Sequence, residues 1–115
     1  MQAPFEIAER DDPDGRVRLT LTGELDLAVA GQLTDRLQQL RDQRRAVRLD
    51  LSRLEFIDSS GIHALINGAA AGHAEDEQLL EVESDLHPSV RRVIELLGIA
   101  PILWPNQDEG LGRKG

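Results

Sequence analysis

The chain has 115 residues, of which 40% are hydrophobic, a formal net charge of −8 at pH 7 and no cysteine. This length suits one compact domain, and the negative charge disfavours binding to nucleic-acid phosphates or anionic membranes. The absence of cysteine excludes disulfides and thiolate metal sites. The N-terminus has no signal-peptide pattern, and no apolar run is long enough to span a bilayer. We therefore expect a cytoplasmic protein that binds proteins or small molecules.

The first predicted elements are two strands. Apolar and polar residues alternate over 17–21, which is the period of a half-buried strand, and a weaker strand is predicted over 5–8. Residues 11–15 between them combine aspartates with a proline and a glycine, which is typical of a turn. The aspartates lack the ligand spacing of a calcium loop. The sequence therefore predicts an antiparallel hairpin.

Beyond the hairpin, helical and strand-like periods alternate. Apolar residues recur at helical spacing from residue 28 to residue 41, which predicts a helix with one buried face. Pro88 and Gly98 are start and stop signals for a later helix. The remaining predicted elements are, in chain order, a strand over 47–51, a helix over 62–69, a strand over 80–82, a helix over 90–97 and a short strand over 102–104.

This order of elements predicts an α/β fold. Strands that alternate with helices form a sheet with parallel neighbours and helices packed against it. We expect a single domain over residues 1–104, with a mixed β-sheet in which an antiparallel hairpin is followed by parallel strands. Residues 105–115 are polar and glycine-rich, and are predicted to form a flexible tail.

The most informative segment joins the strand over 47–51 to the next helix. The helix is predicted to begin at Asp58-Ser59-Ser60-Gly61. Ser and Asp at such a position commonly cap a helix, which is one interpretation. The alternative is that an exposed serine hydroxyl at this corner accepts a phosphoryl group, whose charge a helix N-terminus tolerates.

Three segments occur in the order and at the spacing of a known family. They are Gly23-Glu24-Leu25-Asp26, Phe56-Ile57-Asp58-Ser59-Ser60-Gly61-Ile62 and Pro88-Ser89-Val90-Arg91-Arg92-Val93-Ile94-Glu95-Leu96-Leu97-Gly98-Ile99. With these motifs the chain resembles the anti-sigma factor antagonists, a family of STAS domains. The resemblance covers residues 5–104, which is most of the chain.

The resemblance implies a role for individual residues. The phosphorylated residue of the family is the hydroxyl that follows the motif aspartate, which here is Ser59. Ser60 is then the neighbouring cap, and Gly61 permits close approach of the partner. The full set of residues implied at the partner surface is Asp26, Asp58, Ser59, Ser60, Gly61, Ile62 and His63.

The resemblance also implies the partners. Members of the family bind an anti-sigma factor that is also an ATP-dependent serine kinase, and this binding frees a sigma factor. Phosphorylation abolishes the binding until a PP2C-type phosphatase reverses it. ATP and magnesium belong to the kinase, so we expect no cofactor in this chain and no enzymatic activity of its own.

Other functions were weighed against this one. His63, His73 and His87 do not share the spacing of a helical metal site, and we expect no metal. Nucleophile-elbow, Walker and dinucleotide-binding patterns are absent from the sequence. The main alternative is a constitutive STAS scaffold or small-ligand-binding subunit of a transport or signalling complex. The intact Asp58-Ser59 pair favours the phosphorylated switch, because a scaffold has no need of an acceptor.

Overall fold

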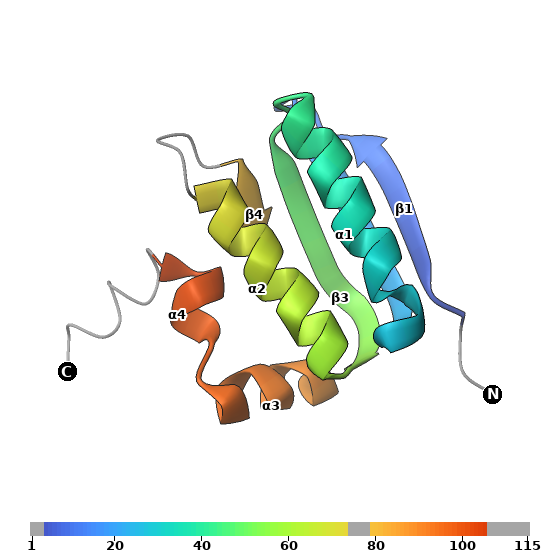
Figure 1. The fold of residues 1–115 in the computed structure, drawn as a ribbon, viewed down its shortest axis with the longest axis vertical. Helices are drawn as coiled ribbons and strands as arrows, with labels where there is room; N and C mark the ends of the chain where they lie inside the picture. Colours follow the sequence, from blue (N-terminus) through green and yellow to red (C-terminus); the bar gives the residue numbers. More distant parts are fainter. Residues whose placement is uncertain (1–3, 74–78, 106–115) are drawn as a thin grey trace.

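A computed structural model describes residues 4–73 and 79–105, and these form one α/β domain (Figure 1). The elements are β1 (Glu6–Asp11), β2 (Val17–Leu25), α1 (Leu27–Asp42), β3 (Val47–Ile57), α2 (Ser59–His73), β4 (Leu80–Val82), α3 (Pro88–Leu97) and α4 (Ala100–Leu103). Among the described residues, no helix is long and apolar enough to cross a membrane. Residues 106–115 of the predicted tail lie outside the described residues. The boundary between the domain and the tail therefore stays a prediction.

The four strands form one mixed sheet in the order β1-β2-β3-β4. β1 is antiparallel to β2, from Glu6 opposite Thr22 to Asp11 opposite Val17. β3 is parallel to β2, and β4 is parallel to β3. The predicted hairpin followed by parallel strands is therefore confirmed. In Figure 1, α1 and α2 lie side by side against one face of the sheet, and α3 lies near the start of α2.

The core lies between the sheet and the helices α1 and α2. Alternate residues of β2 and β3 point toward the helices, and this face is almost entirely leucine and valine. The helices contribute Leu33 and Leu40 from α1 and Leu65 and Ala69 from α2, each at most 1% exposed. Burial of this much apolar surface is the main force that stabilises the fold, and it explains how a chain with three aromatic residues forms a compact core.

The predicted strand over 102–104 is wrong, because this segment ends a short helix, α4. A run of three apolar residues does not distinguish a strand from a buried helical turn, and Pro101 in the first turn favours the helix. Leu103 is buried, and the indole N–H of Trp104 donates a hydrogen bond of 2.6 Å to the carbonyl oxygen of Val82. A side chain therefore covers the edge strand β4 where a further strand was expected.

The opposite face of the sheet carries charged side chains. Arg18 and Arg48 lie opposite each other on β2 and β3, and both donate hydrogen bonds to Asp12 of the hairpin turn, at 3.1 Å and 2.7 Å. Arg10 donates a third bond at 3.4 Å. Asp12 is 8% exposed, and Arg18 also pairs with Glu83 at 2.8 Å. The turn residue Asp12 thus organises an ionic network that turn chemistry alone did not predict.

This network makes the stability of the fold dependent on pH. The hydrogen bond from Arg48, followed by those from Arg18 and Arg10, holds the pKa of Asp12 below its usual value of 3.8. The folded state therefore binds the proton of Asp12 less readily than the unfolded state does. The resulting stabilisation is complete well above pH 3.8 and is lost as the pH falls through the lowered pKa of the folded state.

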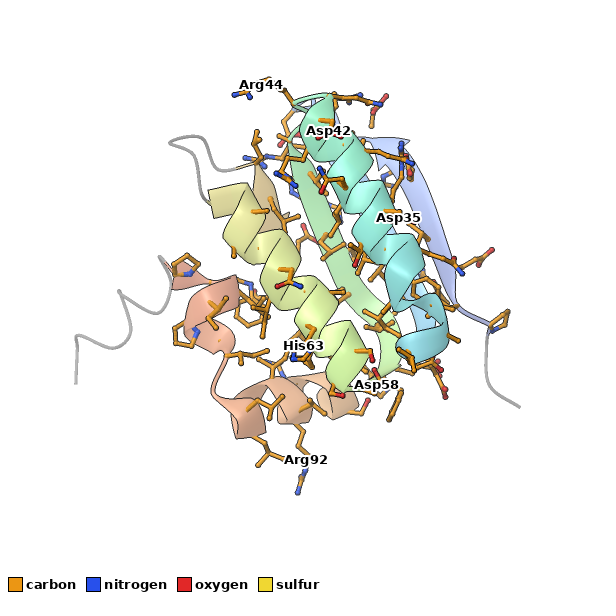
Figure 2. The ribbon with its side chains drawn as sticks, viewed as in Figure 1. Asp35, Asp42, Arg44, Asp58, His63 and Arg92 are labelled. Carbon is orange, nitrogen blue, oxygen red and sulfur yellow. The ribbon has the colours of Figure 1, made fainter. Side chains whose placement is uncertain are left out.

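We predict that the free energy of unfolding, measured with urea, falls between about pH 5 and pH 2 and that Asp12→Asn makes this decline shallower. The asparagine keeps the shape of the side chain but has no carboxylate to protonate. Asp35→Asn, which removes an exposed carboxylate from α1 (Figure 2), is the matched control and should follow the parent protein. An unchanged pH dependence in Asp12→Asn would contradict the prediction.

Candidate functional site

Two helices begin side by side at one edge of the sheet. Because β2 and β3 are parallel, their carboxyl ends meet at the same edge, with Leu25 opposite Ile57. A single residue follows each strand before the next helix begins: Asp26 precedes α1, and Asp58 precedes α2. The two aspartates of the sequence motifs therefore lie at the same edge of the sheet. Figure 2 shows Asp58 at the start of α2.

The carboxylate of Asp58 joins the starts of both helices. Its Oδ1 accepts a hydrogen bond of 3.0 Å from the backbone N–H of Gly61 in α2, and its Oδ2 accepts one of 3.2 Å from Leu27 in α1. Its own backbone N–H donates to the carbonyl oxygen of Leu25 at 3.1 Å. The first N–H groups of a helix have no partner within the helix, so Asp58 satisfies one such group in each of two helices.

The cap of α2 corrects one expectation. Asp58, one of the residues that the sequence allowed as a cap, supplies the acceptor, whereas Ser60, which the resemblance implied as the neighbouring cap, does not. Asp26 caps α1, because its Oδ1 accepts a hydrogen bond of 3.1 Å from the N–H of Ala28. Both caps are aspartates, which are among the preferred residues at this position and also interact favourably with the positive end of the helix dipole.

Ser59 is the first residue of α2 and is exposed, whereas Ser60 is half-buried. Neither hydroxyl makes a hydrogen bond to another of the described residues. Because Asp58 already caps the helix, the Ser59 hydroxyl is not needed for that purpose. The structure therefore presents one exposed hydroxyl on the corner of the domain where β2 and β3 end and α1 and α2 begin.

Gly61 has a role inside the domain. It is buried, and a Cβ atom at this position would lie 2.7 Å from the carbonyl oxygen of Leu25 and 2.7 Å from Cγ1 of Ile57. We expected Gly61 to let a partner approach, but the missing side chain lets α2 pack against the ends of β2 and β3. Ile62, also expected at the partner surface, is 4% exposed and belongs to the core.

The exposed part of the corner includes two apolar side chains that the sequence analysis missed. Leu27, at the start of α1, is 76% exposed, and Phe56, near the end of β3, is 45% exposed. Leu27 is the residue whose N–H binds Asp58, so it lies beside the start of α2. His63 is exposed on α2 (Figure 2). Leu27 lies outside the apolar stripe predicted for its helix. An apolar residue off the buried face was the sequence signal that could have predicted its exposure.

Within residues 4–73 and 79–105, no three histidine, aspartate or glutamate residues are grouped so as to hold a metal ion. His73 ends α2, and His87 caps α3, because its Nδ1 accepts a hydrogen bond of 3.2 Å from the N–H of Ser89. His73 therefore lies at the opposite end of α2 from Ser59. His87 lies near the carboxyl end of β3, because the hydroxyl of Ser89, which it contacts, donates a hydrogen bond to the carbonyl oxygen of Glu55.

Comparison with known proteins identifies the family. The family model described as "Mlab, STAS domain" matches residues 8–104. Because this match covers most of the chain, the protein belongs to the STAS domain family, as its sequence motifs indicated. No curated protein sequence matches the chain.

Solved structures with the same fold include several anti-sigma factor antagonists. The antagonist from Mycobacterium paratuberculosis is 25% identical, with a TM-score of 0.74, over 98% of this chain and 97% of that one. Unphosphorylated SpoIIAA is 20% identical, with a TM-score of 0.63, over 79% and 83% of the two chains. Phosphorylated SpoIIAA from Bacillus is 21% identical, with a TM-score of 0.65, over 84% and 86%.

The packing of Gly61 leads to a prediction for two glycines. Gly61→Ala should lower the free energy of unfolding by about 1–3 kcal/mol, because the new methyl group clashes with backbone and side-chain atoms. Gly31→Ala, in α1, meets no atom within 4 Å and should raise it by up to about 1 kcal/mol through helix propensity. Equal effects in urea denaturation would contradict the packing described for Gly61.

Mutation can separate the capping role of Asp58 from the role of Ser59 as an exposed hydroxyl. Asp58→Ala should destabilise the domain by about 1–3 kcal/mol, because it leaves N–H groups of two helices without their acceptor. Ser59→Ala, the adjacent control, should change stability by less than about 0.5 kcal/mol because its hydroxyl is exposed. Thermal or urea denaturation measures both. A loss in Ser59→Ala as large as that in Asp58→Ala would contradict this division.

Proposed function

We propose that this protein is an anti-sigma factor antagonist regulated by phosphorylation of Ser59. In its unphosphorylated form it binds an anti-sigma factor that is also a serine kinase, and a sigma factor is released. The observation that carries the proposal is the exposed Ser59 hydroxyl at the start of α2, on a corner that Asp58 holds in place. The likeness to an antagonist that matches over 97% of its own chain, together with this protein's membership of the STAS domain family, supports it.

The exposed surface of the corner explains how binding and phosphorylation exclude each other. Leu27 at the start of α1 and Phe56 near the end of β3 offer exposed apolar area, and an apolar partner surface gains free energy by covering them. A phosphoryl group adds about −1.5 to −2 charges at neutral pH. Beside the carboxylates of Asp26 and Asp58, this charge raises the cost of removing water from the corner, so the partner dissociates.

The phosphoryl transfer divides the chemistry between the two proteins. The Ser59 Oγ attacks the γ-phosphorus of ATP, the O–P bond forms, ADP leaves, and the hydroxyl proton passes to a base. Both carboxylate oxygens of Asp58 accept backbone hydrogen bonds, so we assign the base, the ATP and the magnesium ion to the kinase. A PP2C-type phosphatase then hydrolyses the phosphoester and restores the Ser59 hydroxyl.

The location of Ser59 also suits recognition by both enzymes. An exposed first residue of a helix is accessible without any unfolding of the domain. The aspartates at the neighbouring caps tie both strand–helix junctions together, so the hydroxyl has a defined position. A kinase can therefore recognise the folded corner, with Asp26 and His63 at its rim, and need not read an extended peptide.

A constitutive STAS subunit of a transport or signalling complex is the second candidate function. The matching family model carries a description other than antagonist, which is the observation that favours it. Such a subunit keeps its partner whether or not ATP is present. The two functions therefore predict opposite results for the same experiment.

The test incubates the purified protein with each candidate anti-sigma kinase of its own organism and ATP. We expect intact-mass spectrometry to show one added phosphate, and peptide mapping to place it on Ser59. Ser59→Ala should take up no phosphate and remain bound to the kinase in ATP. Ser59→Asp should bind at least about tenfold more weakly, because it carries part of the phosphate charge.

Ser60→Ala is the matched control, since it removes the adjacent hydroxyl and should still be phosphorylated. Phosphate on Ser60 would overturn the assignment of Ser59. An absence of phosphorylation by every kinase, with a complex that persists in ATP, would favour the constitutive subunit. Tight binding of Ser59→Asp would contradict charge as the switch.

A further inference from the structure

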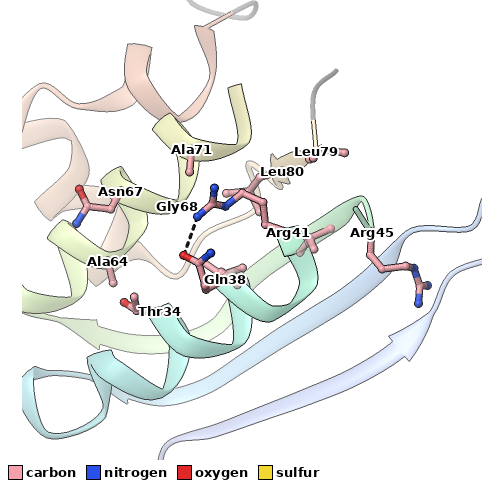
Figure 3. Close-up of a pocket in the computed structure, with 12 residues that line it drawn as sticks. Thr34, Gln38, Arg41, Arg45, Ala64, Asn67, Gly68, Ala71, Leu79 and Leu80 are labelled. Carbon is pink, nitrogen blue, oxygen red and sulfur yellow. Dashed lines mark hydrogen bonds between the residues drawn. The ribbon is translucent and has the colours of Figure 1, made fainter. Parts of the chain in front are cut away.

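A pocket of about 140 Å³ lies between α1 and α2, at the end of the domain away from Ser59 (Figure 3). It is bounded by the later turns of both helices and by the first residues of β3 and β4, Val47 and Leu80. Because Ser59 lies where strands end and this pocket lies where strands begin, the two sites occupy opposite edges of the parallel sheet. The pocket has no part in the proposed phosphorylation.

The floor of the pocket is apolar. Val47, Ala64 and Leu80 are each at most 5% exposed and line it, together with Leu37 of α1 and Ala71 of α2. The uncharged polar residues that line it, Thr34, Gln38 and Asn67, are exposed and belong to its rim. This distribution, an apolar interior with a few polar groups at the opening, is characteristic of small-molecule sites.

One cation lies over the pocket. Figure 3 shows the Arg41 guanidinium directed toward α2 across the opening, whereas that of Arg45 points away. Arg45 is paired with Asp11, at 3.2 Å. Arg41 donates a hydrogen bond of 2.6 Å to Oε1 of Gln38, and no carboxylate among the described residues pairs with it. A guanidinium has five N–H donors, so Arg41 retains donors for an anion above the apolar floor.

We propose that this pocket binds a small carboxylate with a short apolar body. The apolar part occupies the space between Leu37, Ala64 and Leu80, and the carboxylate accepts hydrogen bonds from Arg41. Arginine suits this role because its planar fork matches the two oxygens of a carboxylate. Gln38 holds the guanidinium over the opening, and so reduces the freedom that Arg41 loses when the anion binds.

The volume limits the size of the ligand. An apolar cavity of about 150 Å³ accommodates a benzene molecule, so this pocket accepts on the order of six carbon atoms. Long acyl chains and nucleotides exceed it. The ligand class is therefore a free carboxylate of about six carbons and not a long-chain fatty acid, although the two share the carboxylate group.

In the experiment, sodium hexanoate is added stepwise to the 115-residue protein labelled with nitrogen-15. The chemical shifts of the backbone amides are measured by NMR at each step. We expect saturable changes at Arg41, Gly68 and Leu80, and none at Ser59. Hexanamide, which has the same shape without the charge, should bind about tenfold more weakly. Decanoate should bind no more tightly than hexanoate, because its chain exceeds the pocket.

Variants test the two parts of the site separately. Arg41→Gln should weaken hexanoate binding about tenfold, whereas Arg92→Gln, an exposed arginine on α3 (Figure 2), should leave it unchanged. Ala71→Leu should fill the pocket and remove binding. The spectrum of each variant without ligand shows whether it is folded, so a loss of binding is not confused with a loss of structure.

Several results would overturn the proposal. They are an absence of saturable shifts up to about 50 mM hexanoate, equal binding of hexanamide, unchanged binding by Arg41→Gln, and tighter binding of decanoate. The phosphorylation of Ser59 is measured in a separate experiment with a kinase, so failure of either proposal is distinguishable from failure of the other.

Discussion

The arrangement of the candidate site depends on one carboxylate that serves two helices. Asp58 accepts hydrogen bonds from Leu27 of α1 and Gly61 of α2, which brings two helix N-termini together at the edge of the sheet. Each N-terminus carries a partial positive charge, so their approach would be unfavourable without an anion between them. Asp58 supplies that anion from within the chain, and Ser59 is left exposed as a consequence.

The two faces of the sheet serve the site in different ways. One face is a continuous apolar layer, against which α1 and α2 pack, and it fixes where these helices begin. The other face holds Arg18 and Arg48 among carboxylates contributed by the hairpin turn, by β3 and by β4. The charged network ties the hairpin turn, β2, β3 and β4 together on the side that neither α1 nor α2 covers, so both faces hold the strands that carry the corner.

Much of the fold was predictable from the sequence because it depends on local patterns. The alternation over 17–21, the helical spacing after residue 28 and the turn at 11–15 were enough to predict the hairpin and the first helix. The predicted strand over 102–104 failed because three apolar residues fit either a strand or a helical turn. Its helical form is accompanied by the contact of Trp104 with β4, which no local pattern contains.

Part of the site was also predictable from local patterns in the sequence. The motif located the exposed Ser59 and its neighbours, since this serine and the capping Asp58 are adjacent in the chain. The bond from Leu27 to Asp58 joins residues 31 positions apart, so the bridging role of Asp58 was not visible. The burial of Gly61 and Ile62 and the exposure of Leu27 also follow from the packing of α1 and α2 at the sheet edge, which only the assembled domain defines.

The one-residue junctions at Asp26 and Asp58 constrain the length of the chain as well as its composition. A single residue separates strand from helix at each junction. An insertion there would rotate the following helix and move its first N–H groups away from the capping aspartate. The hairpin turn is constrained in another way, because Asp12 must stay within reach of Arg18 and Arg48. In any chain with the same junctions, the first residue of the second helix is therefore found by counting from the end of the third strand.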